Sequence, residues 1–202
     1  MSRYFPHTAY AEDQPLSHTI LSVHVLTRGY TTGAIVGLGA VSAGSLYSRL
    51  RGAAKPVTTT ASPSAAAAAA ASTTLQKGLP RLLRKTGTAS AVGLGLMGLA
   101  LAGRMQGRED IEWRDRAWRL LENPGQLETD DWTYGGAAAG VVALGAWRLA
   151  GAKGVGGMRA AAGAAGLGSV AGTVGYMVWR YGMHAGKFPE YVSVEKVEFG
   201  RV

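Results

Sequence analysis

The sequence predicts an all-α integral membrane protein with four Gly/Ala-rich transmembrane helices and a short amphipathic helix in the loop between the second and third. Three observations support this fold. Four long segments contain no charged residue, namely Gly29–Ser48, Thr86–Gly103, Trp132–Trp147 and Ala160–Trp179. Each segment carries small residues spaced by four. The chain of 202 residues has 30 glycines but only 3 phenylalanines, which is unlike a soluble core of this size.

These segments divide the chain into nine parts. A helix that crosses a bilayer needs about 20 mostly apolar residues, with about 17 as the lower limit. The third segment is shorter, but the side chain of Arg148 can reach back to the interface and extend it. The expected parts are an N-terminal extension (1–19), a first span (20–48), a basic low-complexity loop (49–85), a second span (86–103), a charged loop with a helix (104–131), a third span (132–151), a short basic loop (152–159), a fourth span (160–181) and a C-terminal tail (182–202).

Residues Gly93–Gly98 read GLGLMG and match the G-x-G-x-x-G pattern of dinucleotide-binding turns. That function requires a preceding strand and a helix that opens at the third glycine. Here the pattern lies in the middle of an uncharged run, and the residues before it are small and do not resemble a strand. We therefore expect no nucleotide at this position, and we interpret the glycines as sites where helices approach closely.

Small residues four positions apart share one face of a helix and allow a neighbouring backbone to come close. The pattern occurs in all four expected spans and predicts a compact bundle, or helices that dock on a larger membrane complex. The candidate helix-packing residues are Gly29, Gly33, Gly37, Gly87, Gly95, Gly136, Gly140, Gly168 and Gly172.

The alternative is a soluble helical protein with Ala- and Gly-rich helices. Glycine in a soluble helix costs about 1 kcal/mol relative to alanine. In a bilayer the same glycines are tolerated, because the backbone groups have no water with which to bond. The composition therefore favours the membrane interpretation.

Charge is distributed unevenly between the two sides of the expected bundle. The loops 49–85 and 152–159 contain basic residues and no acid, and all 13 acidic residues lie on the other side. The positive-inside rule then places these loops in the matrix or cytoplasm and both termini opposite. Anionic phospholipid headgroups, such as those of cardiolipin, are candidate ligands of these loops, although the charges can instead serve only to fix orientation. The candidate contacts are Arg81, Arg84, Lys85, Lys153 and Arg159.

Two segments between the spans differ in character. Residues Pro56–Thr74 are low in complexity and contain seven consecutive alanines, so we expect a flexible linker. Residues 108–125 contain three acid–base pairs at i,i+4 spacing, which predict a helix stopped by Asn-Pro-Gly. This helix is expected either to lie on the surface through its ion pairs, or to contact the membrane interface or a partner through Trp113 and Trp118.

No catalytic, cofactor-binding or metal-binding residue is expected. The four histidines, His7, His18, His24 and His184, do not have metal-ligand spacing, and the chain has no cysteine. No basic surface with interleaved aromatic residues indicates nucleic-acid binding. The start of the chain has neither a secretory apolar core nor an Arg-rich transit pattern, so targeting information is expected to be internal.

The chain resembles the small fungal accessory membrane subunits of mitochondrial respiratory complex I, the NADH:ubiquinone oxidoreductase. The resemblance covers most of the chain and rests on RGYTTGAIVGLGAVSAGSLY, on REDIEWRDRAWRLLENPGQLETDDWTYGGAAAG and on the Ala/Gly-rich closing spans. It implies a non-catalytic subunit that stabilises the membrane arm by contact with other membrane-arm subunits. The implied location is the mitochondrial inner membrane, with both termini in the intermembrane space.

More broadly, four Gly-rich spans with basic matrix loops are similar to the inner-membrane protein import translocase family. The long alanine-containing insert departs from the compact pattern of that family. A component of an import translocase is therefore the alternative function.

Overall fold

The structure is a computed structural model that describes residues 4–52, 63–152 and 154–187. It confirms an all-α fold. In chain order the elements are the 3-10 helix η1 (Ala11–Asp13), α1 (Ser17–Gly52), α2 (Pro63–Met105), α3 (Asp110–Glu122), α4 (Pro124–Leu149), α5 (Met158–Met177) and the π-helix η2 (Val178–Met183), which continues directly from α5.

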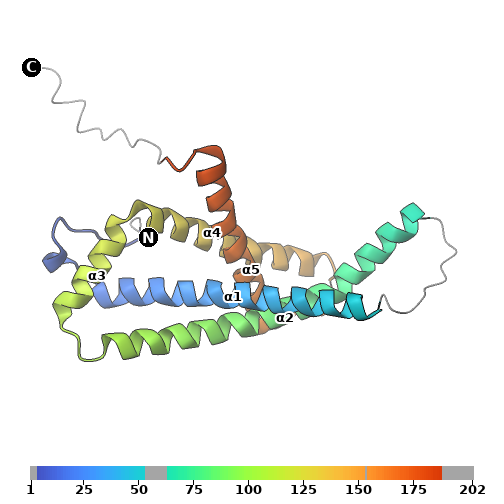
Figure 1. Cartoon of the computed structure of the whole chain (residues 1–202), viewed down its shortest axis with the longest axis horizontal. Coiled ribbons are helices and arrows are strands. Elements are labelled where there is room, and N and C mark those ends of the chain that lie inside the picture. Colours follow the sequence, from blue (N-terminus) through green and yellow to red (C-terminus); the bar gives the residue numbers. More distant parts are fainter. Residues whose placement is uncertain (1–3, 53–62, 153, 188–202) are drawn as a thin grey trace, which may run out of the picture.

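The helices form two pairs joined at one end. Helices α1 and α2 lie side by side and antiparallel, and α3 closes the end where α1 begins and α2 finishes (Figure 1). Helix α4 then runs back along the molecule, and α5 crosses the α1–α2 pair instead of running alongside it (Figure 1). Helix α5 contacts α1, α2 and α4, so it connects the two pairs.

Two helical segments are long and apolar enough to cross a membrane by length and composition alone. They are Gly78–Met105 in α2 and Met158–Met183, which joins α5 and η2. The expected first and third spans lie within α1 and α4, and neither helix reaches the same hydropathy. Within the described residues, the structure therefore shows two candidate spans and does not show four.

Several expected boundaries differ from the observed ones. Helix α1 continues to Gly52 and α2 begins at Pro63, so most of the expected loop 49–85 is helical. Alanine has the highest helix propensity of all residues, which explains why the alanine run extends α2 instead of forming a linker. Residues 53–62 of that loop and residues 188–202 of the expected tail lie outside the described residues.

Helix α4 begins at Pro124, before the expected span at 132. The side chain of Asn123 accepts hydrogen bonds from the backbone N–H groups of Gly125 and Gln126, at 3.0 and 3.3 Å. Proline follows at the first helical position, where its missing N–H removes no intrahelical bond. The Asn-Pro-Gly sequence therefore ends α3, as predicted, and also starts α4.

The predicted amphipathic helix is confirmed as α3. The three predicted i,i+4 pairs form, with N–O separations of 3.9, 3.6 and 3.0 Å for Asp110–Arg114, Glu112–Arg116 and Asp115–Arg119. Its tryptophans contact the N-terminal segment of the same chain. The Trp113 ring stacks on His18, with 4.1 Å between ring centroids, and the Trp118 indole N–H donates to the Thr8 carbonyl at 2.9 Å.

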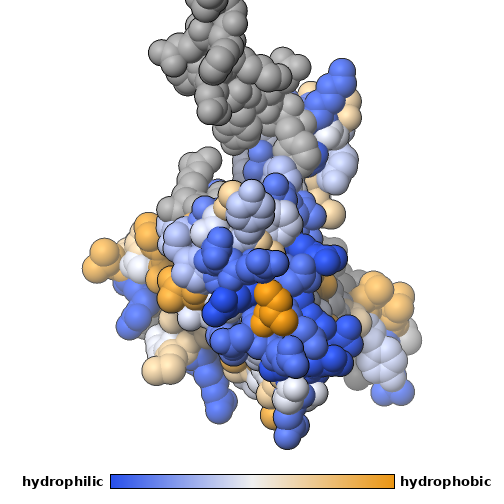
Figure 2. Space-filling model, turned by 90° about the vertical axis from the view of Figure 1, so that its left-hand side faces the viewer, coloured by the Kyte–Doolittle hydropathy of each residue, from blue (hydrophilic) through white to orange (hydrophobic). Residues whose placement is uncertain are grey.

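The end formed by α3 differs from the flanks of the long helices. Seen from the α3 end, hydrophilic residues cover most of the described surface at the centre of the molecule (Figure 2). Along α2, in contrast, the large apolar side chains of Val92, Leu96 and Leu99 are more than half exposed. Little of the apolar surface of the long helices is therefore covered by the chain itself.

Candidate functional site

Helices α1 and α2 meet along three of the predicted glycines. A Cβ atom added at Gly29 would lie 2.6 Å from Cβ of Met97, and one added at Gly37 would lie 2.9 Å from Cβ of Ala89. A Cβ atom at Gly33 would collide with the backbone of Ala89. Real Cβ atoms do not come this close, so no side chain fits at these three positions without a shift of the opposing helix. We call this contact the α1–α2 seam.

Helices α4 and α5 form a second contact of the same type, which we call the α4–α5 seam. Added Cβ atoms at Gly136 and Gly140 would collide with the backbones of Gly168 and Ala164, respectively. One added at Gly172 would collide with the carbonyl of Trp132. The backbones of the two helices therefore touch directly, as in the close glycine crossings of membrane helices.

Helix α5 also packs against α2 with a different face. Gly87 of α2 meets the backbone of Arg159 and Gly163, and Gly163 in turn meets the carbonyl of Leu83. A Cβ added at Gly166 would lie 2.8 Å from the Ser90 hydroxyl oxygen and 3.1 Å from Cβ of Ala34 on α1. Sequence reasoning missed Gly163 and Gly166, because α5 has small residues on nearly every face and the pattern does not say which faces are used.

Polar groups lie at the crossing of α1, α2 and α5. The Thr31 hydroxyl donates to Ser169 Oγ at 3.3 Å, and the Tyr30 hydroxyl donates to the Ala162 carbonyl. Thr86 and Ser90 are fully buried here. Small hydroxyl residues allow the same close approach as glycine and add hydrogen bonds between helices.

Gly95 does not meet the expectation that it packs against a helix. An added Cβ there finds no atom within 4 Å, whereas one at Gly93 would collide with the carbonyl of Gly29. Residues two positions apart on a helix point in directions that differ by about 200° around the axis, so only one of these two glycines can face α1. Within the hexapeptide, Gly93 therefore forms part of the α1–α2 seam and Gly95 faces outward.

An ionic group that the sequence did not reveal joins α1 to α4. The carboxylate of Asp130 is fully buried, and its two oxygens lie 2.8 Å from Nδ1 of His24 and 2.7 Å from Nη2 of Arg28. Arg28 also donates to Oε1 of Gln126 at 3.1 Å. Arg28 is thus held by two partners on α4. We call these residues the Asp130 cluster.

The same end of the molecule carries a buried cation. Arg180 of η2 lies 3.6 Å from the carboxylate of Glu128 and donates to the Gly186 carbonyl at 2.9 Å. Beside it, the rings of Trp132, Tyr176 and Trp179 lie within 6.5 Å of one another, centroid to centroid. These contacts hold the end of α5 and η2 against the start of α4.

The predicted headgroup residues lie at the opposite end. Arg81, Arg84 and Lys85 are on α2, Arg159 is in the first turn of α5, and Lys153 lies outside the described residues. Within the described chain this end contains no acidic residue, because every described acid lies at 12–13 or 109–131. Arg148 was not among the predicted headgroup residues. It lies in the last turn of α4, and its Nη2 comes within 3.9 Å of a Cβ built on Gly156, in the connection between α4 and α5.

The described part of the chain shows contacts that pack helices and pair charges. Among the described residues, no group of three or more His, Asp or Glu side chains could hold a metal ion. No protein-family model, curated protein or solved structure matches the chain.

Proposed function

We propose that the chain is a non-catalytic accessory subunit that stabilises the membrane arm of mitochondrial complex I. The observation that carries this proposal is the exposed apolar face of α2. Val92, Leu96 and Leu99 lie on one side of the helix and are 56, 62 and 72% exposed. A surface of this kind is stable in contact with lipid or with other membrane helices, and it is a liability in water.

The two seams support a role in assembly over a role in chemistry. They fix α1, α2, α4 and α5 by backbone contact, so the outward faces are presented in one arrangement. A rigid apolar surface is what docking onto larger subunits requires. The choice of complex I as the partner rests on the sequence resemblance.

The proposed topology has four spans in the inner membrane and both termini in the intermembrane space. Helices α1 and α4 contain the uncharged runs 29–48 and 132–147, which are compatible with bilayer contact. Transmembrane helices tilt by up to about 40° from the bilayer normal. Because α2 and α5 cross, both can span the bilayer only if they tilt in opposite directions. Protease added to mitoplasts should remove epitope tags at both ends, and protection of either tag would overturn this topology.

The partner is tested by blue-native electrophoresis of mitochondria solubilised in digitonin. The protein should migrate with NADH dehydrogenase activity, and migration elsewhere would refute the proposal. Migration with an import complex would instead support the alternative, a component of an inner-membrane protein import translocase. That alternative is favoured by the four Gly-rich helices and opposed by the length of the first basic segment.

A further inference from the structure

We propose that a groove between α2, α4 and α5 binds one acyl chain of an anionic phospholipid, with its phosphate held by Arg84 and Arg148. The inference rests on the membrane location proposed above and names a ligand for it. It is carried by the shape and lining of the groove, by the position of the two arginines, and by the charge of this end of the molecule.

The groove has a volume of about 610 Å³ and an almost wholly apolar lining. This volume lies within the range of about 300–1,000 Å³ typical of small-ligand sites. The lining side chains include Leu79 and Leu83 of α2, Leu144 and Trp147 of α4, and Leu167 and Ala171 of α5. Gly140 and Gly168 of the α4–α5 seam also line the groove.

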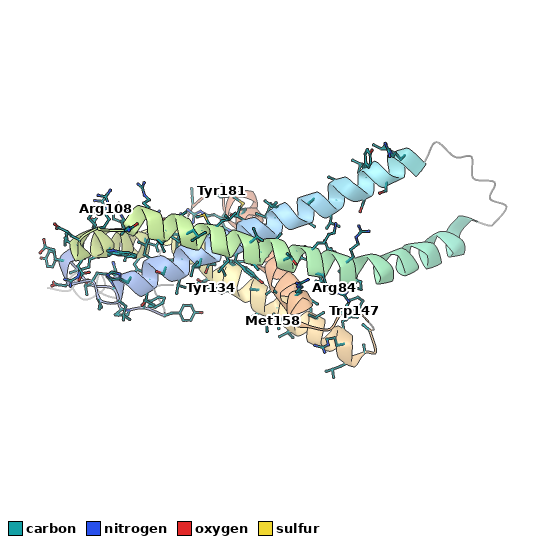
Figure 3. All side chains as sticks on the ribbon, turned by 90° about the horizontal axis from the view of Figure 1, so that it is seen from below. Arg84, Arg108, Tyr134, Trp147, Met158 and Tyr181 are labelled. Atoms are coloured by element: carbon teal, nitrogen blue, oxygen red, sulfur yellow. The ribbon has the colours of Figure 1, made fainter. Side chains whose placement is uncertain are left out.

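Two arginines, each next to a residue that lines the groove, reach the connection between α4 and α5. Arg84 follows the lining residue Leu83, and its Nη2 donates to the Gly154 carbonyl at 2.9 Å. Arg148 follows the lining residue Trp147, and its Nη2 comes within 3.9 Å of a Cβ built on Gly156. Figure 3 labels Arg84 on α2 and Trp147 near the end of α4.

The local charge favours a negatively charged ligand. Neither arginine is in an ion pair within the described residues, and the nearest charged residues along the chain, Lys85 beside Arg84 and Lys153 after Arg148, are also basic. Two guanidinium groups can bind a phosphate through charge-assisted hydrogen bonds. A tryptophan at the same level is typical of the boundary between hydrocarbon and headgroups.

A lipid accounts for both parts of the site. A soluble anion would use the arginines and leave the apolar groove empty, and an apolar helix would fill the groove and leave two cations without a partner. An anionic phospholipid satisfies both, because its apolar acyl chain and its charged phosphate belong to one molecule.

The test uses the full-length protein in mild detergent, with native mass spectrometry to count bound phosphatidylglycerol. We expect the wild type to retain one molecule in preference to phosphatidylcholine. Arg84→Gln and Arg148→Gln should each weaken retention about fivefold, because each basic side chain near a lipid surface contributes about that factor. Ala143→Trp and Ala171→Phe place a ring in the groove from exposed lining positions and should each abolish retention.

Matched controls separate the site from general effects. Val142→Trp adds the same ring next to Ala143 but outside the groove, and Arg104→Gln removes a cation at the other end of α2. Both should bind as the wild type does. Equal losses in Arg104→Gln, unchanged retention in both ring variants, or equal binding of inorganic phosphate would overturn the proposal. Extraction of the wild type from membranes by alkaline carbonate would refute the membrane location itself, which distinguishes the two failures.

Discussion

The two ends of the helix assembly differ in how their charged side chains are paired. At the α3 end, acids and bases are mixed and several are paired with each other, and the side chains of Asp130 and Arg180 are buried among them. At the opposite end, the described charges are all basic and none is paired with an acid. Cations at the first end therefore have carboxylates within the chain as partners, whereas cations at the second end require water or an external anion.

This difference predicts that removal of a charged side chain lowers stability at the α3 end and weakens anion binding at the basic end. The buried carboxylate of Asp130 bridges two helices and contributes to the fold, because its removal leaves the partly buried Arg28 without its ion-pair partner. An exposed cation without a partner contributes little to the fold and is available for binding. Stability measurements and lipid-binding measurements should therefore respond to different sets of residues.

The largest expected effect is at the Asp130 cluster. Asp130→Ala leaves Arg28 and His24 without their partner between α1 and α4, and the free energy of unfolding should fall by about 3 kcal/mol. Unfolding in mixed micelles with increasing SDS measures this change. Glu109→Ala removes an exposed acid at the same end and should have almost no effect. A similar loss in both variants would contradict the distinction between buried and exposed charge.

The next effect lies between the two ends, at the α1–α2 seam. Gly33→Leu places a side chain against the backbone of Ala89, and overpacking of this kind costs about 1–3 kcal/mol. The unfolding midpoint should fall, and adding Gly37→Leu should release the protein from its complex in mild detergent. Gly39→Leu is the control on the same helix, because that glycine has no atom within 4 Å. If Gly33→Leu is as stable as Gly39→Leu, the seam does not hold the helices together.

A smaller effect is expected for the exposed ion pairs of α3. Asp115→Asn removes the 3.0 Å contact with Arg119, and exposed i,i+4 pairs contribute about 0.3–0.5 kcal/mol. The loss should shrink as salt is added, because the interaction is screened. A loss that does not depend on salt would mean that Asp115 acts through something other than this pair.

The smallest effect is expected at the basic end. Replacing Arg81 and Lys85 together by glutamine should not lower the free energy of unfolding, because neither is paired with an acid among the described residues. The same SDS titration checks this, with Asp130→Ala as the reference. A loss comparable to that variant would show that the basic end is also held by its charges.

The seams and α3 were predictable because their signals are local. Glycines four apart and acid–base pairs four apart are read directly from a helical repeat. The spacing of Gly136 and Gly140 therefore identified a packing face, and Asp110 and Arg114 an ion pair.

The Asp130 cluster was not predictable in the same way. Its partners, His24 and Asp130, are separated by 106 residues, and nothing in either local sequence indicates the other. Gly95 shows a related limit, since a helix rich in glycine does not specify which of its glycines face inward. The extent of α2 was missed because an alanine run with no charged or large apolar residue was interpreted as a linker, although its propensity is helical.

The position of α5 among three other helices has a consequence for biosynthesis. Helix α5 is the last of the long described helices to leave the ribosome, yet its backbone meets Gly87 of α2, and its Gly166 lies against the side chains of Ser90 and Thr86. Until then the α1–α2 hairpin exists with an open polar stripe, which an assembly factor or quality-control protease can recognise. A chain that stops before Met158 would lack α5 and would leave that surface of α2 exposed permanently.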